Sequence, residues 1–298
     1  VQEDGDEALA RFSLRFDKAG LTSFEVNEEE FAEAFSLVDD AFIEAVKHSI
    51  TNVTCFHQSQ KPKDWQGRSI DGGLVGQVFV PLSRVGAYVP GGTAAYPSTV
   101  VMTVVPAKVA GVGSVVVCTP PGTDGKANPY TLVAAKMCKA DRVFKLGGAQ
   151  AVAAMALGTE TVPKVDKIVG PGNAYVTAAK KLLNGQVGID MLAGPSEILI
   201  IADESADPRF LAADMLSQAE HDVMAAAVLI TTSYDTAKRV CEELERQLEL
   251  LSRKDIARRS LDGFGAVVIV DDLKQAVELA NDYAPEHLEI MTADPHEL

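Results

Sequence analysis

Residues 217–222 (SQAEHD) combine an amide, a carboxylate and an imidazole within otherwise apolar surroundings. A helical pattern over residues 207–221 puts Gln218 and His221 three residues apart, so that both side chains would leave the same helix face and suit one metal ion. The carboxamide oxygen of Gln218 is neutral and hard, so a zinc site that used it would need at least one further histidine and a carboxylate. A polar helix stripe that faces solvent is the alternative interpretation.

A second stretch, residues 285–289 (PEHLE), places Glu286 next to His287. Pro285 biases Ala284 away from helix and ends the preceding apolar run, so the pair is expected at a boundary where a strand starts. Catalytic residues tend to sit at such boundaries, and a carboxylate beside an imidazole supplies the groups that acid–base catalysis uses. A solvated loop pair is the alternative interpretation.

Three glycine-rich turns fall where predicted strands meet helices: residues 89–92 (VPGG), 145–150 (KLGGAQ) and 169–173 (VGPGN). In an open parallel sheet the carboxyl ends of the strands line the ligand crevice, where the amides of helix N-termini bind phosphate or another anion. We therefore expect a nucleotide. Neither GxGxxG nor GxxxxGK[ST] occurs, so a dinucleotide would be bound in a different way. For any single glycine, a tight turn with positive φ is a sufficient explanation.

The elements that must position these groups alternate between strand and helix. The predicted helices of the first series are residues 98–111, 128–139, 148–157 and 172–183, with strands at 114–118, 142–146 and 165–169. A second series follows residues 194–196 (GPS), with strands at 197–202, 225–232 and 266–270 and helices at 207–221, 234–250 and 272–283. Alternation of this kind predicts α/β units with parallel sheets.

The segment before this alternation is less regular. The spacing of apolar residues between 31 and 46 predicts a packed helix, with Asn27 and Glu30 as a capping box at its start. Residues 51–76 are polar and irregular in pattern, and two strand-like pieces follow at 78–81 and 84–89.

The composition limits the classes of protein. A chain of 298 residues that is 47% hydrophobic can bury a large core, and its length suits two domains. The formal net charge of -15 disfavours a nucleic-acid or anionic-membrane partner, and no apolar run is long enough to span a bilayer. Four scattered cysteines without CxxC spacing fit a reducing cytoplasm. Cys118 and Cys138 lie in apolar patterns and are expected to be core residues.

Six motifs, in this order along the chain, resemble the histidinol dehydrogenase family. They are residues 85–92 (VGAYVPGG), 147–151 (GGAQA), 170–176 (GPGNAYV), 193–197 (AGPSE), 217–222 (SQAEHD) and 285–289 (PEHLE). The resemblance implies an α/β fold of two incomplete Rossmann-like three-layer domains with mainly parallel sheets, one inserted in the other. Residues 88–196 would form the inserted domain with the NAD-contact loops. Residues 1–87 and 197–298 would form a discontinuous domain that carries the metal-site and acid–base residues.

By this resemblance, the protein is a zinc- and NAD-dependent dehydrogenase of the last steps of histidine biosynthesis. It would oxidise L-histidinol through L-histidinaldehyde to L-histidine, a four-electron reaction that uses two NAD molecules in succession. Tyr88, Gln150 and Asn173 would contact NAD, each on or beside a glycine-rich turn. Ser196 would contact the substrate.

The resemblance also implies roles for the two histidine-containing stretches. Gln218 and His221 would bind zinc, and the metal would hold the amine and imidazole of the substrate as a template, so that both residues belong to the substrate site as well. His287 would contact the substrate and take the alcohol proton as hydride leaves. Glu286 would help water add to the aldehyde before the second hydride transfer.

The chain departs from the family pattern at its end. In the family, a further aspartate and a C-terminal histidine from the partner subunit of an intertwined homodimer complete the zinc shell, and both would lie beyond Leu298. The chain is then either a truncated part of a longer protein or a shortened relative that cannot hold zinc with full affinity. The intact catalytic motifs favour truncation, the chain begins at Val1 without methionine, and we expect a homodimer.

Two alternatives stay open at this point. One is a zinc and NAD dehydrogenase of the same fold that acts on another small alcohol, such as a sulfopropanediol, whose sulfonate would need Arg or Lys. The other is a non-catalytic nucleotide- or metabolite-binding homologue that has lost the metal. The presence of both Glu286 and His287 argues against the second alternative.

Overall fold

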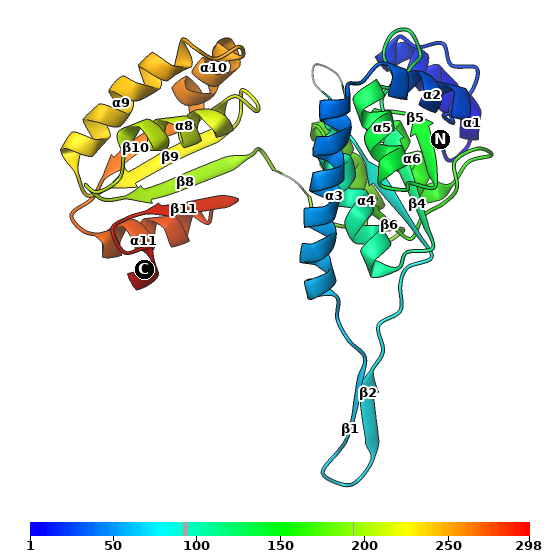
Figure 1. The fold of residues 1–298 in the computed structure, drawn as a ribbon, viewed down its shortest axis with the longest axis horizontal. Helices are drawn as coiled ribbons and strands as arrows, with labels where there is room; N and C mark the ends of the chain where they lie inside the picture. The colour runs from blue at the N-terminus through cyan, green and yellow to red at the C-terminus, as the bar shows by residue number, and fades with distance from the viewer. Residues whose placement is uncertain (92–94, 193) are drawn as a thin grey trace. The chain divides into compact units, whose positions relative to one another are not determined.

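The structure is a computed structural model that describes residues 1–91, 95–192 and 194–298, and its chain divides into two compact units, Val1–Ala193 and Gly194–Leu298 (Figure 1). The division falls within three residues of the predicted seam before residue 197. Residues 1–87 belong to the first compact unit, whereas we expected them to join residues 197–298. The reason is that their helices pack on the first sheet. An additional association with residues 197–298 stays a prediction.

The first unit is built around a five-stranded parallel sheet. Its elements in chain order are α1 (Gly5–Phe12), the π-helix η1 (Ser13–Asp17), α2 (Glu28–Ser36), α3 (Asp40–Gln60), β1 (Trp65–Arg68), β2 (Leu74–Gln77), β3 (Arg84–Tyr88), α4 (Pro97–Ala110), β4 (Ser114–Thr119), α5 (Pro129–Met137), β5 (Arg142–Lys145), α6 (Gly148–Leu157), β6 (Lys167–Val169), α7 (Ala174–Leu183) and β7 (Gly188–Ile189). The strand order is β5-β4-β3-β6-β7, so the chain moves outward from β3 to β5 and then returns to the other side of β3. The switch point lies between β3 and β6.

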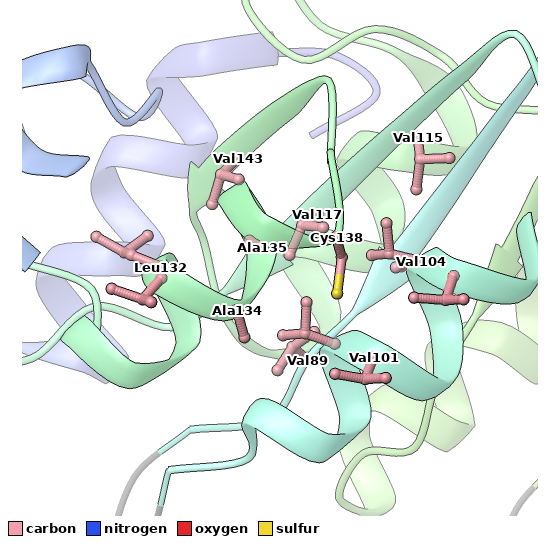
Figure 2. Packing of buried hydrophobic residues seen from close by; sticks show 14 of the residues in the cluster. Val89, Val101, Val104, Val115, Val117, Leu132, Ala134, Ala135, Cys138 and Val143 are labelled. Carbon is pink, nitrogen blue, oxygen red and sulfur yellow. The ribbon is translucent and has the colours of Figure 1, made fainter. Parts of the chain in front are cut away.

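Both faces of this sheet are buried, which explains why its strands are rich in valine rather than alternating with polar residues. On one face, Val115 and Val117 of β4 pack with α4 and α5 (Figure 2). On the other face, Val116 and Cys118 pack with α1, α6 and α7. The period of two along β4 therefore divides its side chains between two separate cores.

The N-terminal segment differs from its prediction. The capping box of Asn27 and Glu30 is confirmed, since each side chain accepts a hydrogen bond from the other residue's backbone N–H. Two helices, α2 and α3, replace the single helix that we expected. The side chain of Asp39 accepts a hydrogen bond from the Phe42 N–H (2.8 Å) and so caps the start of α3.

The segment after α3 also differs from its prediction. Residues 51–76 are not irregular: α3 continues to Gln60, and β1 and β2 form an antiparallel hairpin. Nearly all hairpin residues are exposed, so the polar and apolar alternation that marks a half-buried strand is absent. Residues 78–81 form no strand.

The second unit repeats the same kind of fold around four parallel strands. Its elements are β8 (Glu197–Ala202), α8 (Pro208–Ala219), β9 (Ala226–Thr231), α9 (Tyr234–Leu248), α10 (Lys254–Phe264), β10 (Gly265–Ile269), α11 (Leu273–Tyr283), β11 (His287–Met291) and the 3-10 turn η2 (Pro295–Glu297). The strand order is β10-β9-β8-β11. The two sheets confirm the predicted α/β class with mainly parallel strands. Sequence reading missed α10, whose core contacts are Ala257 and the partly buried Leu261.

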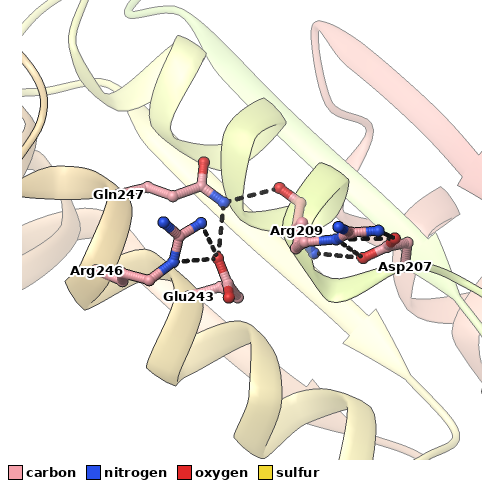
Figure 3. A network of polar contacts seen from close by, with 5 residues as sticks. All are labelled: Asp207, Arg209, Glu243, Arg246 and Gln247. Carbon is pink, nitrogen blue, oxygen red and sulfur yellow. Dashed lines mark hydrogen bonds and ion pairs between the residues drawn. The ribbon is translucent and has the colours of Figure 1, made fainter.

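Helices α8 and α9 cover one face of this second sheet, and α11 covers the other. Figure 3 shows a polar contact that joins α8 to α9: Gln247 donates to the backbone carbonyl of Arg209 (2.9 Å), and within α9 it also donates to Glu243 (3.1 Å). Such exposed contacts contribute little stability, so the apolar layer beneath α8 holds it on the sheet. In the part of the chain that the structure describes, no helix has the length and apolar character needed to cross a membrane.

Candidate functional site

The glycine-rich turns of the first unit gather at the carboxyl edge of its sheet. Residues 89–91 follow β3 and residues 170–173 follow β6, so two of the three turns flank the switch point, where ligands of open α/β sheets bind. The third turn, residues 146–148, joins β5 to α6. Gly92, the last residue of the first predicted turn, lies outside the described residues.

Tyr88 ends β3 and ties two of these turns together. It is 4% exposed, and its hydroxyl accepts a hydrogen bond from the Gly148 N–H (3.0 Å) at the start of α6. Burial raises the pKa of Tyr88 to about 12, so the phenol stays protonated at neutral pH and keeps an O–H to donate. Gln150 lies in the same helical turn and is also buried. Its carboxamide closes on Gly148, because a Cβ there would stand 2.9 Å from the Gln150 Oε1.

The turn after β6 passes very close to β3. Gly170 has φ +108°, and a Cβ on it would stand 2.1 Å from the carbonyl oxygen of Tyr88, so only glycine fits. Asn173 is the N-cap of α7, and its side-chain oxygen accepts from the N–H groups of Tyr175 and Val176 (3.1 Å each). The structure thus brings Tyr88, Gln150 and Asn173 to one sheet edge.

A cavity of about 390 Å³ opens at the ends of β3 and β4. Its lining includes Gly91, Asn128 and residues 119–122 from the loops at this edge, together with Glu30 of α2. The volume lies within the range of roughly 300–1,000 Å³ that small-molecule sites occupy. The cavity shares Gly91 with the first glycine-rich turn. Its described lining also includes the carboxylates of Glu33 and Asp124 and none of the three candidate NAD residues.

In the second unit, the candidate residues gather at the opposite, amino edge of the sheet. β8 and β11 are parallel neighbours with His287 opposite Ile198, so Ser196 and Glu286 lie just before these two strands begin. The Glu286 carboxylate accepts a hydrogen bond from the Glu197 N–H (3.3 Å). The predicted strand start after Pro285 is confirmed.

Glu286 and His287 stand next to each other and both reach solvent. The His287 Nε2 lies 3.9 Å from the Glu286 Oε1, and the two side chains are 58% and 48% exposed. At this separation and exposure the two groups do not form a buried ion pair. Both groups are therefore open to a substrate that binds at this edge.

The helix that carries Gln218 ends earlier than predicted. α8 stops at Ala219, Glu220 is its C-cap and His221 lies in the following turn, so the expected common helix face is wrong. The turn forms because the Asp222 side chain accepts from the Met224 N–H (2.9 Å) and its carbonyl accepts from Ala225 (3.0 Å). Gln218 is buried, whereas His221 is exposed.

Sequence reading missed a pair of neighbouring carboxyl groups, Asp214 of α8 and Glu289 of β11. Burial raises the pKa of both groups. Glu289 shares its strand face with His287, and Gln218 lies one helical turn beyond Asp214. Because α8 must return to the amino edge before β9 starts, Gln218 and His287 approach the same corner of the sheet. Glu289 is two residues after His287, and this spacing was the signal in the sequence that the two side chains share a strand face.

Gln218 and His221 could supply part of the ligand set of a zinc site. Zinc takes neutral imidazole and oxygen ligands, and Gln218 offers a 7% exposed carboxamide that has no hydrogen-bond partner among the described residues. His221 offers an exposed imidazole. Tetrahedral zinc needs four ligands, and no group of three or more His, Cys, Asp and Glu side chains that could hold a metal occurs in residues 1–91, 95–192 and 194–298. The described residues supply two donors and not a full set.

The cysteines behave as predicted. Cys118 and Cys138 are buried, and burial raises the pKa of both thiols. A buried protonated thiol is a poor nucleophile, so both residues serve the core.

Comparison with known proteins gives matches over the whole chain. The sequence profile described as histidinol dehydrogenase matches residues 1–298. A histidinol dehydrogenase from Geobacter metallireducens is 53% identical over 302 aligned residues, and one from Clostridium acetobutylicum is 50% identical over 297. Each alignment covers 100% of this chain and 69% of the relative.

Among solved structures, the crystal structure of histidinol dehydrogenase from Elizabethkingia anophelis has a TM-score of 0.96 at 40% identity, and the match covers 100% of this chain and 69% of that one. An acetylating aldehyde dehydrogenase from Geobacillus thermoglucosidasius has a TM-score of 0.54 at 13% identity, with 97% of this chain and 74% of that chain covered. The second likeness concerns the fold alone.

Proposed function

Because the chain belongs to the histidinol dehydrogenase family, we propose that it oxidises L-histidinol through L-histidinaldehyde to L-histidine, the last steps of histidine biosynthesis, with NAD and zinc. The observation that carries the proposal is the convergence of Ser196, Gln218, Glu286 and His287 on one corner of the second sheet. A binding protein without chemistry would have no need for a base and a carboxylate beside a buried, unpartnered metal donor.

In this proposal, the carboxyl edge of the first sheet binds NAD. Tyr88 and Gln150 close the turn at the start of α6, and Asn173 fixes the start of α7. These helix starts lie at the carboxyl edge of the sheet, beside its switch point, where open α/β sheets bind nucleotides, and this position supports the proposal.

The chain's own residues would perform the proton transfers. His287 is exposed enough to accept the hydroxyl proton of the alcohol as the carbon–hydrogen bond breaks. Glu286, held by the Glu197 N–H, would take a proton from the water that adds to the aldehyde carbon. The resulting hydrate again has a hydroxyl and a carbon–hydrogen bond, so His287, after releasing its first proton to solvent, would act as a base a second time.

The two cofactors would complete this set of groups. When bound, NAD supplies the hydride acceptor for each of the two oxidations, and zinc supplies a Lewis-acid template for the amine and imidazole of histidinol. Gln218 and His221 would be two of the zinc ligands, and Ser196 would contact the substrate beside them.

We also propose a homodimer in the cytoplasm. Exposed apolar side chains gather on and after the hairpin, where Ile70, Val78 and Val80 are each more than 70% exposed. An apolar surface of this kind is what a second copy would cover.

The proposal is tested by following NADH absorbance after the full-length protein is mixed with NAD and L-histidinol. Two NADH for each histidinol, lost in the presence of a zinc chelator, are expected. A parallel reaction with a sulfopropanediol separates the rival substrate: NADH from the diol and none from histidinol would overturn the assignment. Absence of NADH with either alcohol would favour a protein that binds without catalysis.

Replacement of the two acid–base residues separates their roles. His287→Asn is expected to lower the rate of the first oxidation by about a hundredfold to ten thousandfold, the usual contribution of a positioned base, while zinc stays bound. Glu286→Gln is expected to slow only the second oxidation, so that one NADH forms rapidly and histidinaldehyde accumulates. Rapid-mixing measurements of NADH distinguish these patterns. Unchanged turnover of His287→Asn would remove that residue from the mechanism.

A further inference from the structure

Lys180 is a buried cation that the proposed reaction does not use. It lies near the end of α7, and its side chain is 3% exposed. Its ammonium group donates to the carbonyl oxygen of Gly170 (2.9 Å) and pairs with the carboxylate of Asp190. The cation therefore reaches back along its own helix to the turn that precedes that helix.

Asp190 completes the arrangement from the other side. It follows the short edge strand β7, and its carboxylate accepts from the Gly170 N–H (2.7 Å) and from its own neighbour, the Met191 N–H (2.7 Å). Its backbone N–H in turn donates to the Ile168 carbonyl (3.2 Å). Both backbone polar groups of Gly170 are thus held by one ion pair.

The turn that is held needs outside support. Its sequence, Gly170–Pro171–Gly172, contains two glycines, which have the largest backbone freedom to lose. Neither glycine can be replaced to stiffen the turn, because a Cβ on Gly170 would meet the Tyr88 carbonyl at 2.1 Å and one on Gly172 would meet Val176 at 2.4 Å. The geometry of the turn must therefore be fixed by hydrogen bonds.

An ion pair is a costly way to gain stability alone. Charges removed from water lose hydration, and apolar residues of similar volume often hold a core as well or better. The pair at Lys180 and Asp190 does what apolar side chains cannot do, since it supplies one donor and one acceptor to the backbone of the same residue, Gly170. This points to a role in geometry rather than in packing.

We propose that Lys180 and Asp190 are positioning residues for the nucleotide: the pair fixes the Gly170 turn, and the turn places Asn173, the N-cap of α7, against bound NAD. This inference rests on the proposed NAD site. It adds two residues that do not touch the cofactor and that act through the backbone of Gly170.

The test measures both Michaelis constants in the full-length enzyme. Lys180→Met and Asp190→Asn are expected to raise the KM for NAD at least tenfold and to leave the KM for histidinol within twofold. Lys180→Arg, which keeps the charge and a donor, is expected to recover part of the loss. Lys181→Met, an exposed neighbour on the same helix, is the matched control and is expected to change neither constant.

A second control separates this role from general stability. Arg142 and Glu25 form an ion pair at the other end of the same sheet, so Arg142→Met is expected to lower the melting temperature and to leave the KM for NAD unchanged. The double variant Lys180→Met/Asp190→Leu removes both charges and is expected to melt above the single Lys180→Met variant. Its KM for NAD is expected to stay raised, because Gly170 has lost both partners.

Two results would overturn the inference. One is a folded Lys180→Met variant with a KM for NAD within twofold of the unchanged enzyme. The other is a double variant that recovers stability and the KM for NAD together, which would mean a structural role only. Direct titration with NADH, followed by its fluorescence, keeps this test separate from the proposed reaction: an enzyme that binds NADH and does not oxidise histidinol refutes the reaction, whereas equal NADH binding by Lys180→Met refutes the positioning role.

Discussion

At the scale of single residues, a buried polar group is informative when it lacks a partner. Asp17, at the end of η1, has a buried Oδ2 without a hydrogen-bond partner among the described residues. Its other oxygen faces the turn before α6, where a Cβ on Gly147 would stand 3.4 Å away. Burial raises the pKa of this carboxyl above its ordinary value of 3.8. The charged form therefore costs stability in the folded state.

Replacement of Asp17 by Asn should stabilise the protein, and more so as the pH rises. A group whose pKa is raised on folding destabilises the native state above its unfolded pKa, so the penalty is absent at low pH and develops as the pH rises from about 4 toward 7. The gain at pH 7 is expected to reach about 1 kcal/mol, the low end for an unsatisfied buried group, because the side chain is only partly buried. Urea denaturation at pH 4.5 and 7 measures the difference.

Glu3→Gln serves as the control for this effect, since Glu3 is exposed and its replacement removes one negative charge from the same unit. It should change stability by less than about 0.5 kcal/mol at either pH. If Asp17→Asn were less stable than the unchanged protein at pH 7, the carboxylate would have a favourable partner, such as the positive end of α6.

At the scale of elements, the link between α11 and β11 is strained where it matters for the site. Ala284 has φ +52° and ψ +61°, the left-handed conformation, and its N–H still donates to the Ala280 carbonyl (2.8 Å). The expectation that Pro285 keeps Ala284 out of the helix is confirmed, and the helix ends through a left-handed cap. The strained residue lies two positions before Glu286, so this tight cap fixes the backbone position from which Glu286 and His287 extend.

Replacement of Ala284 by glycine should therefore raise stability. A left-handed alanine costs about 1–2 kcal/mol, and the additional freedom of glycine in the unfolded chain costs about 0.5–1 kcal/mol, so the net gain is expected to be about 0.5–1 kcal/mol. Glycine in place of Asn281, an exposed position with ordinary helical geometry in α11, should destabilise the protein slightly. Thermal melting of the two variants gives the comparison. A loss of stability in Ala284→Gly would mean that the cap is not strained.

How far the elements could be predicted depended on what each one buries. Helix α6 and strand β8 were predicted with their observed bounds, because their apolar runs are bounded by turn residues. The hairpin of β1 and β2 was missed because it buries almost nothing. The alternation of apolar and polar residues that reveals a strand arises only where one face of the strand is buried. The early end of α8 was missed because Glu220 and His221 are residue types compatible with helix. The Asx turn at Asp222 ends the helix before them.

At the scale of the whole molecule, each unit uses a different edge of its own sheet. The candidate nucleotide residues lie at or after the carboxyl ends of β3, β5 and β6, as general rules for open α/β sheets predict. The candidate metal and acid–base residues precede β8 and β11 or follow α8, at the amino edge, where those rules place no site. Sequence patterns located the residues of the second group. The patterns did not reveal that these residues lie at the amino edge of the sheet, because this depends on the pairing of β8 with β11.

This division predicts that the two sets of ligands protect different parts of the chain from hydrogen exchange. NADH alone, at a hundred times its dissociation constant, stabilises what it binds by about 2.7 kcal/mol, which slows exchange through local opening about a hundredfold. The slowed amides should lie in residues 146–150 and 170–176. Zinc with histidinol should instead protect residues 218–225 and 286–291, and a chelator should remove the second pattern and leave the first. Protection by NADH that was confined to residues 194–298 would contradict the assignment of the nucleotide to the first unit, whatever the rate of the reaction.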